Sequence, residues 1–349
     1  MSRWSDSLEE VARGVLPESV HRYFRQGARE GVSTAEAAAA WDAYRLLPRV
    51  LHDVTSVRTS TRLLGTPVYS PFAVAPTTLQ RAAHPEGEVA MAQAVADAGS
   101  LMVVSSNAGT TFEAIADTGA PWWLQVYLPA DRATCTPLLR RAVAAGAKAI
   151  VLTVDTPVVG TKYDQGDVVW DVIDPAWFRV NFPPSYGERP GDAKATDLGP
   201  RDIGWLAETT RLPVVVKGVL RPEDARRCVD AGAAAVWVSN HGGRQLDFTA
   251  ATADCLGAVA ADVGRDAEVY VDGGVRNGRH GMTALALGAT GVFLGRLPLY
   301  ALAVDGRGGV ARLFAGLDHE LAEAMRLAGC ARPAAVTPEL LRVQPRDDR

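Results

Sequence analysis

The chain has 349 residues, of which 48% are hydrophobic and 22% are charged. This length and balance favour one large globular domain and exclude a chain that is disordered by composition. Lys and Arg total 36 against 40 Asp and Glu, which gives a net charge of -4. With no long basic block, the chain is not expected to bind nucleic acid.

The ends of the chain and its cysteines indicate its compartment. The N-terminal sequence MSRWSDSLEE lacks the apolar core of a signal peptide, and the apolar stretches are too short or too interrupted to span a membrane. Cys135, Cys228, Cys255 and Cys330 lie far apart without CxxC spacing. We expect a cytoplasmic protein with reduced structural thiols and no metal site.

Short β-branched runs alternate with helical patterns eight times along the chain. The predicted strands are 68–75, 101–105, 122–127, 149–155, 213–217, 234–240, 268–272 and 291–295. The amphipathic segments 85–98, 132–145, 222–231 and 282–287 lie between strands and end at Gly99, Gly146, Gly232 and Gly288, where a helix C-cap favours glycine. Eight strand-then-helix repeats predict an α/β fold, the (β/α)8 TIM barrel.

Three regions fall outside this repeat. Residues 1–60 form a predicted helical N-terminal extension to a catalytic barrel at 61–340. Residues 157–200, after the fourth strand, are rich in Pro, Gly and aromatic residues and too long for an ordinary connection, which predicts a lid. The charged segment 341–349 is expected to be a flexible tail.

Each predicted strand ends in polar or glycine-rich residues, and barrel enzymes build their sites at these ends. The ends read Pro76-Thr77-Thr78, Ser105-Ser106-Asn107, Gln125-Val126-Tyr127, Thr153-Val154-Asp155, Lys217-Gly218, Ser239-Asn240-His241, Asp272-Gly273-Gly274 with Arg276, and Gly295-Arg296. A barrel with only a structural role does not need such groups at all eight ends. The ring therefore predicts a ligand site.

Glycine and arginine cluster after strands seven and eight, where barrels commonly hold a phosphate. Gly273, Gly274 and Gly295 would let backbone N–H groups approach phosphate oxygens. Arg276 and Arg296 offer charged donors to the same group. We expect a phosphate site here rather than tight turns with surface arginines.

Lys217 ends the apolar run PVVVK, so its amine must point into the barrel mouth and find an anionic or polar partner. Two roles fit this position. The amine would form a Schiff base with a carbonyl substrate, or it would stabilise negative charge on an electron-rich ring.

In the segment VSNHGGRQLD, His241 and Arg244 leave one strand end three residues apart. This spacing can place an imidazole and a guanidinium on the same ligand. An arginine fork holds a carboxylate, and a histidine beside it can take a proton from the adjacent carbon or its hydroxyl. Asp155, at the end of the fourth strand, is expected to orient the imidazole and stabilise its charged form.

These segments resemble a known family. APTTLQRAAHPEGE, LTVDTP, VVVKGV, VSNHGGRQLD, VDGGVR and GVFLGR look like the FMN-dependent L-2-hydroxy acid oxidases and dehydrogenases, which include glycolate oxidase, lactate oxidase and mandelate dehydrogenase. The resemblance runs from about Leu8 to Arg332. It implies FMN as cofactor, a 2-hydroxy acid as substrate, O2 or another electron acceptor, and a homotetramer or homo-octamer. No GxGxxG follows a strand, which favours FMN over a dinucleotide.

The resemblance also implies residue roles. His241 becomes the catalytic base with Asp155 as its acidic partner, Arg244 binds the substrate carboxylate, and Tyr23 and Tyr127 hydrogen-bond substrate. Lys217 would lie beside the flavin N1 and C2 carbonyl, where its charge stabilises the reduced ring. The implied flavin contacts are Pro76, Thr77, Thr78, Ser105, Gln125, Thr153 and Ser239, and the implied ribityl-phosphate site is Asp272, Gly273, Gly274, Arg276, Gly295 and Arg296.

Three positions depart from the family pattern. Lys162 stands where the family usually has a second carboxylate-binding arginine, and lysine lacks the fork. Thr78 replaces a small residue beside the flavin, and Asn107 replaces a common aromatic wall. These departures suggest a substrate other than glycolate or lactate. The lid aromatics Trp170, Trp177 and Phe178 favour a bulky or aromatic one.

The leading interpretation is FMN-dependent oxidation of an (S)-2-hydroxy acid to the 2-oxo acid, with electrons passing to O2 to give hydrogen peroxide or to another acceptor. Three alternatives stay open. One is an FMN barrel enzyme acting on a different carbonyl or amino compound. The others are a flavin-free Schiff-base lyase using Lys217 and a non-catalytic scaffold.

Overall fold

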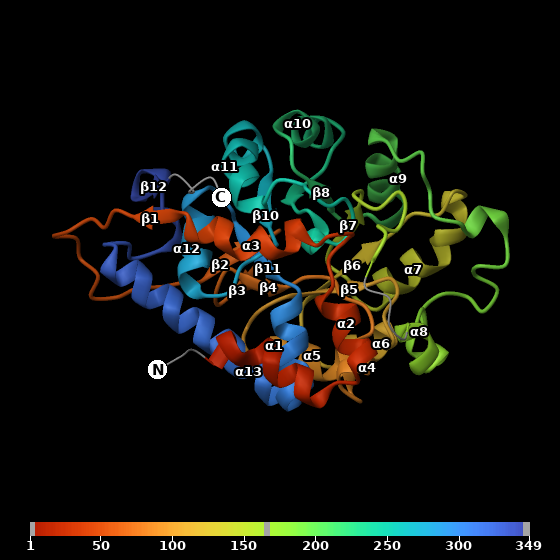
Figure 1. Ribbon diagram of the computed structural model, residues 1–349. Helices are drawn as coiled ribbons and strands as arrows, with labels where there is room; N and C mark the ends of the chain where they lie inside the picture. The colour runs from red at the N-terminus through yellow and green to blue at the C-terminus, as the bar shows by residue number, and fades with distance from the viewer. Residues whose placement is uncertain (1–3, 164–167, 345–349) are drawn as a thin grey trace.

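The computed structural model describes residues 4–163 and 168–344, and at its centre lies a closed barrel of parallel strands (Figure 1). The strand order around the barrel is β10-β11-β4-β5-β6-β7-β8-β9. The bounds are β4 Phe72–Val74, β5 Met102–Ser105, β6 Trp122–Val126, β7 Ile150–Thr153, β8 Val214–Val219, β9 Ala235–Val238, β10 Glu268–Val271 and β11 Gly291–Leu294. The predicted (β/α)8 barrel is confirmed.

Helices surround the barrel and connect its strands. They are α4 Gln80–Ala83, α5 Gly87–Asp97, α6 Phe112–Ala116, α7 Thr136–Ala144 preceded by the 3-10 turn η1 Arg132–Cys135, α9 Pro200–Thr210, α10 Pro222–Asp230, α11 Thr252–Val263, α12 Gly278–Ala286 and α13 Arg296–Leu327. The helices α5, α7, α10 and α12 end as predicted at glycines with positive φ: 55° at Gly99, 91° at Gly146, 94° at Gly232 and 101° at Gly288. These left-handed values favour glycine over residues with a Cβ atom.

One predicted strand is divided in two. Within 68–75 the chain first completes β3 Thr66–Val68, which pairs antiparallel with β2 Thr61–Leu63, and then begins the barrel strand β4. Pro71 lies between them. Because proline has no N–H to donate and a fixed φ, it interrupts the ladder that the hydrophobic pattern suggested.

Four aromatic side chains fill the barrel interior. Trp123, Trp237, Tyr270 and Phe293 are almost fully buried, and the Trp237 and Phe293 ring centroids lie 3.9 Å apart. Large apolar side chains in this position close the interior, as expected for a barrel with a packed core. This packed interior leaves the end where the strands terminate as the place for a ligand.

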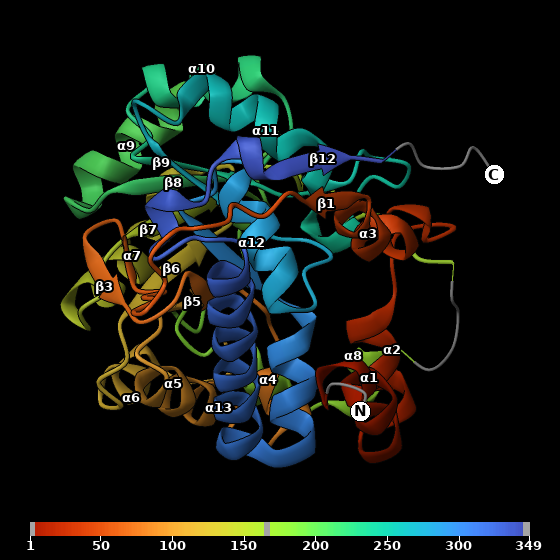
Figure 2. The ribbon, with the colours of Figure 1, turned by 90° about the vertical axis from the view of Figure 1, so that its left-hand side faces the viewer.

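The N-terminal extension contains three helices that lead from the barrel side to its mouth (Figure 2). The first, α1 Trp4–Val15, packs against α13, and α3 Val32–Asp42 packs against the turn η4 His241–Gly243. Between them, α2 Glu18–Arg25 brings Tyr23 to the mouth. Helices cover most of residues 4–42, whereas Tyr44–Leu46 form β1 and residues 47–60 contain no helix or strand, so the helical part is shorter than the predicted 1–60. Residues 1–3 lie outside the described part of the chain.

The predicted tail begins later than expected. The chain passes through the turns η5 Pro333–Ala335 and η6 Pro338–Leu340 and then forms β12 Leu341–Val343, which pairs antiparallel with β1 Tyr44–Leu46. A flexible tail from residue 341 is therefore wrong for β12, because a long-range pairing fixes a segment whose own sequence is charged. Residues 345–349 lie outside the described residues.

The lid is tied to the loops that follow β5 and β6. It contains α8 Val169–Val172, η2 Pro175–Trp177 and η3 Pro190–Asp192. Three backbone hydrogen bonds join its last part to the segment after β6: Ala195 N–H to Leu128 O at 2.9 Å, Ala130 N–H to Ala193 O at 2.7 Å, and Asp131 N–H to Gly191 O at 2.9 Å. The lid therefore has a defined course where it is described, and residues 164–167 lie outside that part.

Two further predictions concern cysteines and membranes. All four cysteines are free thiols, and burial raises the pKa of Cys135 to about 12 and that of Cys228 to about 11. Within residues 4–163 and 168–344, no helix combines the length and apolar character that a membrane span requires.

Candidate active site

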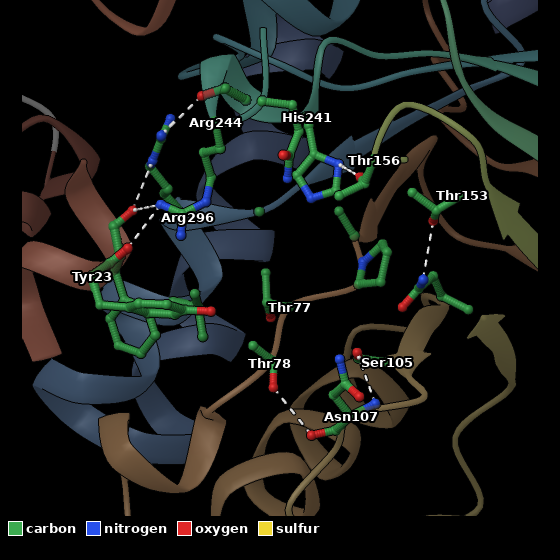
Figure 3. A pocket seen from close by; sticks show the side chains of 18 of the residues that line it. Tyr23, Thr77, Thr78, Ser105, Asn107, Thr153, Thr156, His241, Arg244 and Arg296 are labelled. Carbon is green, nitrogen blue, oxygen red and sulfur yellow. Dashed lines mark hydrogen bonds between the residues drawn. The ribbon is translucent and has the colours of Figure 1, made fainter. Parts of the chain in front are cut away.

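A cavity of about 870 Å³ opens at the C-terminal strand ends, under the lid and beside α2 (Figure 3). Its size lies in the upper part of the range for small-molecule sites. The predicted residues that line it are Tyr23, Pro76, Thr77, Thr78, Ser105, Gln125, Tyr127, Thr153, Lys162, Lys217, His241, Arg244, Asp272, Gly273, Gly274, Arg276, Gly295 and Arg296. Asp155 and Ser239 do not line the cavity. Each contacts a residue that does, because Asp155 hydrogen-bonds to His241 and Ser239 hydrogen-bonds to Lys217.

His241 and Asp155 form a pair at the cavity wall. The Asp155 Oδ1 atom lies 2.8 Å from His241 Nδ1 and accepts a hydrogen bond of 3.0 Å from the Thr156 hydroxyl. Burial raises the pKa of Asp155, but the charge and hydrogen bond of His241, with the charge of Lys217, bring it below its usual value. An ionised Asp155 accepts a proton from Nδ1, so that in the neutral imidazole Nε2 is the nitrogen free to accept one.

The backbone that presents His241 explains the two glycines in its motif. His241, Gly242 and Gly243 have φ values of 58°, 63° and 73°, all left-handed. A Cβ atom on Gly243 would lie 2.4 Å from Thr34 Oγ1 and 2.6 Å from Thr34 N, against α3. Asn240 also stabilises the turn, since its Oδ1 accepts a hydrogen bond of 3.3 Å from Gly243 N–H.

Lys217 lies near the His241–Asp155 pair, and the carboxylate of Asp272 compensates its charge. Its Nζ atom is 2.9 Å from Asp272 Oδ2 and donates a 2.7 Å hydrogen bond to Ser239 Oγ. Both charged side chains are less than one tenth exposed, and the ammonium lies 5.2 Å from the centroid of the Trp237 ring. A buried lysine held by a carboxylate suits charge stabilisation better than nucleophilic attack.

Arg244 connects the His241 turn to α2. Its Nη1 donates hydrogen bonds of 2.8 Å to the carbonyl oxygens of Tyr23 and Gln26, and its guanidinium lies 5.0 Å from the Tyr23 ring centroid. Figure 3 shows this guanidinium at the cavity wall between Tyr23 and His241. Burial raises the pKa values of Tyr23 and Tyr127, so both phenols remain hydrogen-bond donors at neutral pH.

Lys162 lines the cavity, but its amine binds backbone. Its Nζ donates to the carbonyl oxygen of Gly160 at 2.8 Å and to that of Arg244. Burial, followed by the charge of Arg244, lowers the pKa of Lys162 to about 8. The amine thus stabilises the backbone at Arg244. An arginine at position 162 would offer a planar fork of donors in place of this single ammonium group.

The other two departures from the family pattern contact each other. The Thr78 hydroxyl donates a 3.1 Å hydrogen bond to the carbonyl oxygen of Asn107. The Asn107 side chain in turn accepts a 3.2 Å hydrogen bond from Arg179 Nε on the lid. Asn107 therefore joins a strand end to the lid, where an aromatic residue would have formed an apolar wall.

Buried positive charge surrounds the predicted phosphate site. Burial lowers the pKa of Arg296 to about 10, and the charges of Arg244 and Arg276 contribute. None of these three arginines forms an ion pair within the described part of the chain. A Cβ atom added to Gly295 would meet nothing closer than Thr77 Cγ2 at 4.0 Å, so this backbone faces open space. A phosphate beside Gly295 would offset the arginine charge.

The strand ends between the phosphate region and His241 carry amide and hydroxyl groups, which suit a ligand ring with polar edges. Gln125 Nε2 donates a 3.1 Å hydrogen bond to Thr153 Oγ1, and Gln80 Nε2 donates one of 3.1 Å to Thr77 Oγ1. The buried Oδ1 atom of Asp272, which lines the cavity, has no hydrogen-bond partner among the described residues. Orphaned buried acceptors are rare in proteins and are typical of a site that awaits its ligand. FMN therefore fits these residues.

Several residues that line the cavity are absent from the sequence prediction. Thr156 supports Asp155 and could have been found from its adjacency in the sequence, whereas Arg179 and Lys194 come from the irregular lid and carry no local signal. Among the lid aromatics, Trp170 and Phe178 line the cavity as expected. Trp177 does not line it, because its ring stacks under the Arg81 guanidinium at 5.4 Å.

This fold and site define a barrel oxidoreductase with a phosphate-bearing flavin. The chain belongs to the family of FMN-dependent dehydrogenases, whose sequence profile matches residues 12–343. FMN is therefore its cofactor, and the flavin-free lyase alternative is wrong.

Individual relatives agree with the family. The human 2-hydroxyacid oxidase 1 is 39% identical over 97% of this chain and 96% of its own length. The L-lactate oxidase of Nostoc sp. is 38% identical over 93% of both chains. A solved structure of mandelate oxidase with (S)-2-phenylpropionate has a TM-score of 0.88, with 37% identity over 97% of both chains. The chain is thus a member of a 2-hydroxy acid oxidase family.

Proposed function

We propose that the protein oxidises an (S)-2-hydroxy acid to the corresponding 2-oxo acid. The observation that carries this proposal is the His241–Asp155 pair, at 2.8 Å, beside Arg244 in a cavity whose floor holds Lys217. When bound, FMN supplies a two-electron acceptor that O2 or another acceptor reoxidises, with hydrogen peroxide as the product from O2.

The chain's own residues then divide the remaining tasks. Arg244 binds the carboxylate next to the alcohol carbon, because a guanidinium anchored through Nη1 offers a rigid donor to an anion. Tyr23 and Tyr127 donate hydrogen bonds to the carboxylate and the 2-hydroxyl. These contacts fix which hydrogen of the substrate faces the cofactor and exclude water from the reacting carbon.

His241 acts as the base. Its unprotonated Nε2 would take the hydroxyl proton, and the hydrogen on C2 would leave with the electron pair of its bond to the two-electron acceptor that FMN supplies, so that the alcohol carbon becomes a carbonyl. Asp155 holds Nδ1–H and stabilises the imidazolium that forms. Lys217, held in place by Asp272 and Ser239, would bring its positive charge next to the ring that gains electrons.

Gly273, Gly274, Gly295, Arg276 and Arg296 are proposed to hold the FMN phosphate. The proposed contacts to the flavin ring come from Pro76, Thr77, Thr78, Ser105, Gln125 and Thr153. Ser239, which the sequence also predicts as a contact, does not line the cavity and instead accepts a hydrogen bond from Lys217. The cytoplasmic location and the homotetramer or homo-octamer stay predictions from the sequence and the resemblance.

An anaerobic stopped-flow experiment tests the function. A panel of (S)-2-hydroxy acids should bleach the flavin absorbance, and His241→Ala should keep FMN bound but reduce it about 10² to 10⁴ times more slowly. An FMN barrel acting on a carbonyl or amino compound predicts no bleaching by any member of the panel. Equal bleaching rates in the parent and His241→Ala would remove His241 as the base.

A further inference from the structure

The cavity carries two separate positive regions. One consists of Arg244 and Lys162 beside His241, and the other of Arg179 and Lys194 on the lid. Burial lowers the pKa of both lysines. Beyond burial, the charge that shifts Lys162 is that of Arg244, whereas Lys194 responds to Asp155 and Arg179. The contacts of the two amines differ as well, because Lys162 donates to the carbonyl oxygens of Gly160 and Arg244, whereas Lys194 lies over the Tyr127 ring.

No acidic side chain among the described residues forms an ion pair with Arg179 or Lys194, and Asp155, whose charge reaches Lys194, is itself paired with His241. Among the described residues that line the cavity, the acids are Asp192 and Asp272. Asp272 is paired with Lys217, and Asp192 Oδ2 accepts backbone hydrogen bonds of 3.0 Å from Gly187 and 3.2 Å from Arg189. Neither forms an ion pair with a lid cation in the described part of the chain.

Lys194 is held in place by backbone pairing. Its segment forms a bridge with Pro129, flanked by the hydrogen bonds of Ala193 and Ala195 to the segment after β6. This pairing sets the ammonium 4.3 Å from the centroid of the Tyr127 ring, at the proposed position of the substrate. A cation over an aromatic face keeps its N–H groups available to an anion on the other side.

Arg179 is fixed from the loop after β5. Its Nε donates a 3.2 Å hydrogen bond to Asn107 Oδ1, and its guanidinium lies 4.8 Å from the Phe178 ring centroid and 5.7 Å from that of Tyr186. Tyr186 stacks on Phe182 at 4.0 Å, and both rings line the cavity. The lid region thus combines an apolar wall with two anchored cations.

We propose that Lys194 and Arg179 bind a second carboxylate at the far end of the substrate, so that the protein acts on an (S)-2-hydroxy dicarboxylic acid. This inference rests on the proposed function and leaves its reaction unchanged. Arg244 binds the carboxylate next to the reacting carbon, the methylene chain passes Tyr127, and the distal carboxylate meets the lid cations. A distal carboxylate also supplies the counter-charge that the cavity lacks.

The test compares each diacid with its ω-amide, which has the same shape and no distal charge. The substrates are (S)-malate, (S)-2-hydroxyglutarate and (S)-2-hydroxyadipate, and anaerobic flavin reduction by the holoenzyme gives kred/Kd for each. At least one diacid should exceed its amide about tenfold or more, as a hydrogen bond between charged groups allows. Lys194→Met should lower that ratio at least tenfold, Arg179→Gln should lower it less, and Lys194→Arg should restore it in part.

Arg189→Gln is the matched control, because Arg189 is an exposed cation of the same lid that does not line the cavity. It should leave the ratio unchanged. The inference is overturned if no diacid exceeds its amide in the parent protein. It is also overturned if Lys194→Met slows diacid and amide equally, which would make Lys194 a positioning residue for Tyr127.

Binding without turnover separates this inference from the proposed function. Titration of the flavin absorbance with the matching 2-oxo diacids, such as 2-oxoglutarate, measures affinity directly. Binding that weakens at least tenfold in Lys194→Met, with no flavin reduction by any hydroxy acid, would support the diacid site and refute the oxidation. Reduction by monoacids alone would support the oxidation and refute the diacid site.

Discussion

The adjacent glycines of the His241 turn offer a matched pair of substitutions. Both have left-handed φ, 63° at Gly242 and 73° at Gly243, so alanine at either site costs about 1–2 kcal/mol in backbone conformation. Their surroundings differ. A Cβ atom on Gly242 would lie 3.5 Å from Arg296 Nη1, which is ordinary contact, whereas one on Gly243 would lie 2.6 Å from the backbone nitrogen of Thr34.

Gly243→Ala should therefore destabilise the fold more than Gly242→Ala. The clash adds the cost of overpacking, about 1–3 kcal/mol, to the conformational term. With an unfolding entropy of about 2.1 cal/mol/K per residue, each kcal/mol lowers Tm by about 1.4 °C in a chain of this length. The expected losses are about 1–3 °C for Gly242→Ala and about 3–7 °C for Gly243→Ala.

Circular dichroism melts at a fixed scan rate and saturating FMN measure both variants. Flavin reduction by a 2-hydroxy acid gives a second readout, because the turn also carries His241. It should slow more in Gly243→Ala, where relief of the clash must move either the turn or α3. A Tm for Gly243→Ala equal to or above that of Gly242→Ala would show that α3 does not restrain the turn.

Three further outcomes follow from the site. Flavin released by acid should be FMN in a ratio near one per chain, and chromatographic identification as FAD would contradict the single phosphate region around Arg276 and Arg296. Arg244→Lys should weaken substrate binding by about 1–3 kcal/mol through loss of the fork, with kred changed less than Kd; a larger change in kred would mean that Arg244 acts on the reaction itself. Lys162→Arg should improve kcat/KM for glycolate and lactate more than for larger acids, and an equal effect on all acids would mean that the side chain acts only on the Arg244 backbone.

The barrel and much of its ring of site residues could be predicted because their signals are local. A β-branched run, a polar strand end and a glycine after a helix are each written in a few consecutive residues, as at Gly99 and Gly146. The parallel barrel then brings the strand ends to one face whatever the loops do. This is why His241 and Asp155, 86 positions apart in the sequence, were expected to meet.

The features that escaped prediction depend on contacts between distant segments. The segment β12 forms a strand because β1 pairs with it. The Trp177 ring lies outside the cavity because it stacks on the Arg81 guanidinium. The amine of Lys162 was expected near substrate, yet the Arg244 carbonyl oxygen lies within its reach. In each case the position of the residue or segment depends on a partner far away in the sequence. No local sequence pattern identifies that partner.

The same reasoning separates the reaction from its specificity in this chain. The groups proposed to carry the oxidation, His241, Lys217 and Arg244, stand on strands or on the turn after β9, where the barrel fixes them. The lid cations are instead held by a few hydrogen bonds to loops. Arg179 bonds to the loop after β5, and the backbone around Lys194 bonds to the segment after β6. Because a lid substitution leaves those strands intact, the charge at the far end of the cavity can change without disturbing the base. The choice of 2-hydroxy acid is therefore expected to follow the lid, and substitutions there should alter Kd between substrates before they alter the rate of the chemical step.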